Sequence, residues 1–183
     1  VKGRTDILNR SPAVSVVGAR NASINGRKLA SRIAYDLTGA GVLIVSGMAR
    51  GIDTAAHKGA KFALNRTGST VAVLGTGIDI AYPAENQKLC EQIAGQGAVI
   101  SEFPLGTEPS AGNFPRRNRI VSALTDGTLV VEASLHSGSL ITARLALEQG
   151  RDVFAVPGFP TDERSAGPNK LIKDGAFLVE NAE

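Results

Sequence analysis

The chain has 183 residues, about the length of one domain, and it can bury a sizeable core. Hydrophobic residues make up 43% and charged residues 20%, and no apolar run approaches the roughly 20 residues that a membrane span needs. The single cysteine, Cys90, excludes an internal disulfide and predicts a cytoplasmic protein. A formal net charge of +3 permits a nucleic-acid partner without requiring one.

Seven short runs rich in β-branched residues are predicted to be strands. They are nearly continuous in apolar character, which is typical of strands buried on both faces of a sheet. The runs are Ala13–Val17, Val42–Val45, Thr70–Leu74, Ala98–Ser101, Thr128–Val131, Val153–Val156 and Ala176–Val179.

Helical patterns lie between the predicted strands. Leu29, Ile33 and Leu37 recur every four residues, as on one face of a helix, and similar patterns occur near 89–93 and 141–145. Alternating strands and helices predict an α/β protein with a mostly parallel, doubly wound sheet of the extended Rossmann type. We expect a single domain over residues 13–183 and an N-terminal leader over residues 1–12, with irregular structure over residues 103–113 and 157–168.

The connection after the second predicted strand has the composition of an anion-binding site. Gly47 and Gly51 would let a phosphate approach the backbone, Arg50 adds a positive charge, and a helix of small residues starts at Ile52. The alternative is a tight turn in which the glycines only relieve backbone strain. Asp53 and His57 lie four residues apart on that helix, but with two histidines and one cysteine in the chain we expect structural roles for them and no metal.

The second candidate segment, residues 113–121, surrounds one aromatic residue with three arginines. Arginine can grip phosphate with two nitrogens, and Phe114 could stack on a base. The alternative is a solvated helix start with Phe114 in the core. Because positive charge at a helix N-terminus costs stability unless an anion offsets it, Arg116 and Arg117 favour the binding interpretation.

A third loop, Ser137–Ser139, leads into the helix near 141–145. Ser139 is predicted to cap that helix, and Gly138 would let a ligand approach the backbone. Since ligands of open α/β sheets bind beyond the carboxyl ends of the strands, these loops should meet at one edge. Arg20, after the first predicted strand, should lie there too. The chain has neither a dinucleotide-binding fingerprint nor a Walker A loop, so we expect no nucleotide cofactor.

Five blocks in order together resemble the DNA-processing protein A (DprA/Smf) family. They read SGMARGIDTAAHKGA, GTGIDIAYPAEN, FPRRNRIVSAL, SGSLITARLALEQGRDVFAVPG and GPNKLIKDGA. The resemblance runs from about Ala13 to Gly175. It implies a cytoplasmic protein, not an enzyme, that binds single-stranded DNA without sequence preference and loads the RecA recombinase onto it during natural transformation. The family's N-terminal helical and C-terminal winged-helix domains are expected to be absent here.

Carried over residue by residue, the resemblance gives a DNA pocket, to which charge and strand-end placement add further candidates. From the family come Gly47, Arg50, Phe114, Arg117 and Asn118, with Ser137, Gly138 and Ser139 nearby; our additions are Arg20, Arg116, Arg119 and Lys170. The resemblance also implies a homodimer through the C-terminal part of the domain. The apolar run Ala176–Val179 fits, because an exposed sheet edge needs a cover.

The alternative function is enzymatic. Rossmann-like proteins that cleave nucleotide N-glycosidic bonds bind the phosphate with a glycine-rich loop and use a glutamate and an arginine for the chemistry. Here Ser137–Ser139 would be that loop, and Glu132 with Arg144 the reacting pair. The doubled glycine usual in such loops is missing, which favours DNA binding.

Overall fold

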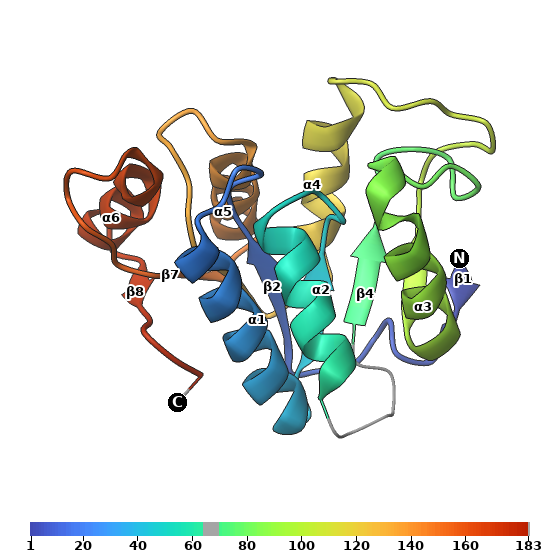
Figure 1. Ribbon diagram of the computed structural model, residues 1–183, viewed down its shortest axis with the longest axis horizontal. Helices are drawn as coiled ribbons and strands as arrows, with labels where there is room; N and C mark the ends of the chain where they lie inside the picture. The colour runs from blue at the N-terminus through green and yellow to red at the C-terminus, as the bar shows by residue number, and fades with distance from the viewer. Residues whose placement is uncertain (64–69, 183) are drawn as a thin grey trace.

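The computed structural model describes residues 1–63 and 70–182, which form a three-layer α/β structure (Figure 1). Its eight-stranded sheet has the order β1-β5-β4-β3-β2-β6-β7-β8. The strands are β1 (Lys2–Gly3), β2 (Ala13–Val17), β3 (Leu43–Ser46), β4 (Thr70–Val73), β5 (Ala98–Ile100), β6 (Gly127–Val130), β7 (Asp152–Ala155) and β8 (Phe177–Leu178). The helices are α1 (Ile24–Gly39), α2 (Ile52–Phe62), α3 (Gln87–Gln96), α4 (Asn113–Ala123), α5 (Gly138–Glu148) and α6 (Ala166–Lys173), with the short 3-10 helices η1 (Ala84–Asn86) and η2 (Glu163–Ser165).

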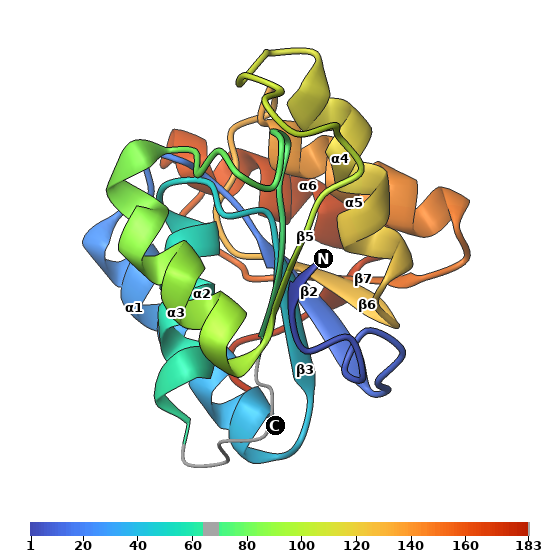
Figure 2. The same ribbon diagram turned by 90° about the vertical axis from the view of Figure 1, so that its right-hand side faces the viewer.

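Helices cover both faces of the sheet. In Figure 2, α1, α2 and α3 lie on one side of the strands and α4, α5 and α6 on the other. Val16 and Val17 of β2 show why the strands are apolar throughout: Val16 packs with Ile33 of α1, and Val17 belongs to the cluster that contains Val121 of α4. Because consecutive side chains point to opposite faces, a strand buried on both sides needs apolar residues at every position.

The predicted fold class is confirmed, and each of the seven predicted strands is present with bounds within one residue of the prediction. Six neighbouring pairs in the sheet are parallel. The additional strand, β1, lies in the residues expected to be a leader and pairs antiparallel with β5, while Ile7 is buried in the core. Residues 157–168, expected to be irregular throughout, include η2 and the start of α6.

The order of the strands decides where a ligand can bind. The chain runs outward from β2 through β3 and β4 to β5, then returns to place β6 on the other side of β2. The loops after β2 and β6 therefore diverge at the carboxyl edge, which opens a crevice at this switch point. Among the described residues, no helix is both long and apolar enough to cross a lipid bilayer.

Candidate functional site

A cavity of about 830 Å³ lies at this carboxyl edge. Its walls come from the loops after β2, β3, β4, β5, β6 and β7 and from residues of α2, α4 and α5. Eight of the twelve predicted binding residues line it: Arg20, Gly47, Phe114, Arg117, Asn118, Ser137, Gly138 and Ser139. The fold thus brings together loops that are separated by more than a hundred residues of sequence.

One end of the cavity combines aromatic rings with positive charge. Phe114 is half-buried, with its ring centroid 5.4 Å from that of Tyr82, and the guanidinium carbon of Arg20 lies 5.3 Å from the Phe114 centroid. The ring packs over Gly75, where an added Cβ would come within 2.8 Å of a ring carbon. Arg50 lines a small adjoining cavity and forms an exposed ion pair with Glu85 at 2.9 Å. Phe114 is therefore neither a free ring nor a core residue.

The Gly47 loop is filled by the chain's own groups. Asp53 Oδ2 accepts hydrogen bonds from the backbone N–H groups of Gly47 and Ala49, each at 3.2 Å. The N–H of Ile52, at the start of α2, donates to the Ala19 carbonyl. These donors were expected to face a phosphate; instead a carboxylate of the first helical turn holds the loop. The alternative interpretation of this loop, a tight turn without a bound phosphate, therefore accounts for these N–H groups.

Arg117 differs most from its expected role. Its side chain is buried, with 4% of the residue exposed, and Nη1 donates to the carbonyl oxygens of Gly47 and Val73. Burial lowers the pKa of Arg117 to about 10, while nearby Asp53 opposes that shift; burial also raises the pKa of Asp53. Arg117 remains charged at neutral pH and ties α4 to the ends of β3 and β4. It forms part of the cavity floor and is not an exposed fork for phosphate.

The third loop is held by serine and asparagine side chains. Ser137, and not Ser139, caps α5: its Oγ accepts from the Ser139 N–H at 3.4 Å and lies 2.8 Å from Ser139 Oγ. Asn118 Nδ2 donates to the Gly138 carbonyl at 3.2 Å, which links α4 to α5. An added Cβ at Gly138 would meet nothing within 4 Å, so packing does not require a glycine there.

Besides Arg50, which lines only the small adjoining cavity, three predicted cations line neither cavity. Arg116 lies over the Phe103 ring, at 5.5 Å from its centroid. Arg119 forms an ion pair with Glu102, and Lys170 forms one with Asp174 at 2.8 Å. Arg116 and Arg119 face away from Arg117 because residues one and two positions away on a helix do not share a face.

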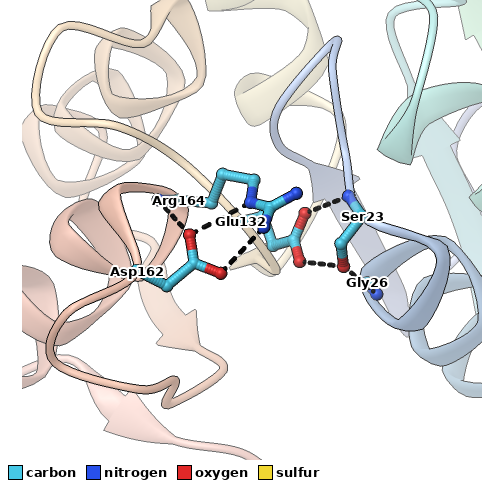
Figure 3. Close-up of polar contacts among 5 residues, drawn as sticks. All are labelled: Ser23, Gly26, Glu132, Asp162 and Arg164. Carbon is cyan, nitrogen blue, oxygen red and sulfur yellow. Dashed lines mark hydrogen bonds and ion pairs between the residues drawn. The ribbon is translucent and has the colours of Figure 1, made fainter.

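Sequence reasoning missed two features: the contact between Glu132 and Ser23 at the start of α1, and Arg164 of the β7–α6 connection in the cavity wall (Figure 3). Glu132 accepts from the Ser23 N–H at 2.8 Å and from Ser23 Oγ at 2.6 Å, and Ser23 Oγ accepts from the Gly26 N–H. The glutamate therefore fixes the start of α1. Arg164, which lines the cavity, donates through Nε and Nη2 to the two carboxylate oxygens of Asp162, each at 3.0 Å. Arg164 follows β7 as Arg20 follows β2, so its position after a predicted strand could have identified it as a candidate.

The pair required by the enzymatic alternative is not assembled. Glu132 is engaged with Ser23, whereas Arg144 is exposed on α5 and pairs with Glu148 at 3.5 Å.

His57 is buried with Nδ1 at 2.8 Å from Thr70 Oγ1, and burial lowers its pKa to about 3. Within residues 1–63 and 70–182, no group of three or more histidine, cysteine, aspartate or glutamate side chains could hold a metal ion.

Known proteins match this chain in fold, and the matches cover nearly all of its length. A family model described as DNA recombination-mediator protein A matches residues 1–183. Protein Smf of Escherichia coli is 50% identical over the whole chain, which covers 48% of that protein. The X-ray structure of DNA processing protein A from Streptococcus pneumoniae is 45% identical with a TM-score of 0.91, over 99% of this chain and 62% of that one. DNA processing protein A from Helicobacter pylori, described for its single-stranded DNA binding mode, is 32% identical with a TM-score of 0.90, over 99% and 81%. The chain thus spans about half to two thirds of the length of the first two relatives.

Proposed function

This chain belongs to the DNA recombination-mediator protein A family, and from that premise we propose that it binds single-stranded DNA across the cavity without sequence preference. The observation that carries the proposal is the pairing of Arg20 with the Phe114 ring at the cavity wall. A cation beside a stacking face suits a phosphate and its neighbouring base, whatever the base.

The cavity supplies the other contacts that such binding needs. The hydroxyl groups of Ser137 and Ser139 and the amide of Asn118, which line the cavity, would offer hydrogen bonds to sugar or phosphate. Gly138 leaves open space at the start of α5, where the helix dipole favours an anion. Arg50 would add a phosphate contact by leaving Glu85, an exposed ion pair of little stability.

We further propose that the bound strand is passed to the RecA recombinase, as the family description of a recombination mediator suggests, and that this serves natural transformation in the cytoplasm. A homodimer through β8 is part of the proposal. Phe177 and Leu178 lie on the outermost strand of the sheet with 59% and 54% of their surfaces exposed. An exposed apolar edge strand is a site for association.

Cleavage of nucleotides is the less favoured function. The glutamate and arginine that it requires are engaged elsewhere, with Ser23 and Glu148.

The test is the dependence of affinity on strand length. We expect affinity to rise between a dinucleotide and an oligomer of about ten nucleotides, and the logarithm of affinity to fall with the logarithm of salt by about 0.7 per phosphate neutralised. Duplex DNA of equal length is the competitor. A length-independent affinity, or release of free base from a nucleoside monophosphate, would overturn the proposal.

A further inference from the structure

A second aromatic side chain lies in the connection between β7 and α6, which contributes residues to the cavity wall. Phe159, in the connection that follows β7, has 74% of its surface exposed, more than any other large apolar residue in the described part of the chain. Glu163 and Arg164, a few residues later in the same connection, line the cavity wall. The exposed ring is therefore continuous in the chain with the proposed DNA site.

The connection that carries Phe159 is held at several points. Asn169 of α6 exchanges two hydrogen bonds with the backbone of Gly158, at 3.1 and 2.9 Å, and the Phe159 carbonyl accepts from the Asp162 N–H at 3.0 Å. The Arg164 carbonyl accepts from the Ala133 N–H at 2.7 Å, which anchors the segment to the end of β6. The ring is thus exposed on an ordered backbone, so a ligand would lose little loop entropy on binding it.

Charge distinguishes this connection from the surroundings of Phe114. Asp162 and Glu163 are acidic, and two nitrogens of Arg164 are already bonded to Asp162. A phosphate would be repelled here, whereas the flat face of a neutral base would not. This part of the surface therefore suits the bases of a strand whose phosphates lie toward Arg20.

We propose that Phe159 is a second base-stacking platform for the single strand that the cavity binds. This inference rests on the proposed function and adds to it a direction: the strand runs from Phe114, over the end of β4, to Phe159, beyond the end of β7. Four strand spacings separate β4 from β7 in the sheet, which is about 19 Å at about 4.8 Å each. A dinucleotide has one internucleotide step, which cannot bridge that distance, whereas a strand of about twelve nucleotides spans it even when stacked at about 3.4 Å per step.

The experiment compares Phe159→Ala with the unaltered chain on a thymidine dinucleotide and on an oligothymidylate of about twelve nucleotides, at two salt concentrations. We expect the variant to bind the longer strand about 5- to 150-fold more weakly and the shorter strand unchanged. Its salt dependence should equal that of the unaltered chain, since no phosphate contact is lost. Phe159→Tyr should retain the affinity, and Phe159→Leu should not, because it keeps apolar area but no ring.

The matched control is Phe62→Ala. Phe62 is also highly exposed and lies beside a cation, Lys61. It is the last residue of α2, and because the first turn of α2 is at the carboxyl edge, Phe62 lies at the end of the helix that is far from the cavity. We expect Phe62→Ala to bind both strands as the unaltered chain does. Equal affinity of Phe159→Ala for the longer strand overturns the inference, and so does a shift from dimer to monomer without loss of affinity, which would identify a second copy as the occupant. If the unaltered chain itself binds both strands equally, the proposed function fails and this inference with it.

Discussion

The guanidinium of Arg117 lies directly against Gly47: Nη1 donates to the Gly47 carbonyl, and a Cβ added at Gly47 would come within 2.5 Å of that nitrogen. This contact joins α4 to the loop after β3 beneath the cavity. A glycine at position 47 therefore leaves the room that the buried Arg117 side chain occupies.

We expect Gly47→Ala to lower the free energy of unfolding by about 1–3 kcal/mol, because the methyl group must displace a buried charged side chain. Chemical denaturation measures the change. Gly138→Ala is the control, since a Cβ there meets open space, and it should stay within about 0.5 kcal/mol of the unaltered chain. Equal stability of the two variants would show that Arg117 has an alternative position.

Phe114→Ala should weaken single-strand binding by about 1–3 kcal/mol. The ring is half-buried against Gly75 and Tyr82, so the variant should also lose stability, but less than the roughly 3–5 kcal/mol typical of a fully buried phenylalanine. Titration with an oligonucleotide and thermal unfolding measure the two effects. Unchanged binding with a large loss of stability would assign Phe114 to the core alone.

Arg20→Gln should reduce the slope of log affinity against log salt by about 0.7, the value for one phosphate contact on a single strand. The reduction should be the same for unrelated base sequences. Arg32→Gln is matched in charge and lies on α1 in an exposed pair with Asp36, so it should leave the slope unchanged. Arg117→Gln should instead reduce stability, because two carbonyl groups lose their buried donor.

His57 should make the protein sensitive to acid. Its pKa is lowered to about 3 by burial, against 6.5 for a free imidazole. Between these values the unfolded chain binds a proton that the folded chain does not, so the free energy of unfolding falls as pH falls, by up to about 1.4 kcal/mol per pH unit. Denaturation between about pH 6 and 4 should be less pH-dependent in His57→Gln than in the exposed control His136→Gln. Parallel curves would contradict the prediction.

The exposed β8 edge predicts an effect on assembly. We expect the chain to sediment as a dimer at micromolar concentration and Leu178→Lys to sediment as a monomer, because a buried lysine would lack a partner. Ile24→Lys, at an exposed apolar position on α1, is the control. Sedimentation of the unaltered chain as a monomer would remove β8 as an interface in this chain.

The candidate site could be predicted in part because its residues follow strands. Arg20, Gly47 and Ser137 were identified from their position after apolar runs, and the parallel sheet places such loops at one edge. The roles inside the loops could not be predicted in the same way. A phosphate and the carboxylate of Asp53 satisfy the same N–H groups, so the composition of the Gly47 loop fits either.

The sequence by itself determined the fold class and the bounds of seven strands, because burial on both faces leaves a local pattern that needs no knowledge of the neighbours. Only the tertiary structure decided which side chains face the cavity. The order β4-β3-β2-β6-β7 places Arg117 beneath Gly47, engages Glu132 with Ser23 and adds Arg164 to the wall. These partners are 70 and 109 residues apart in the chain, and no local pattern encodes a contact at that separation.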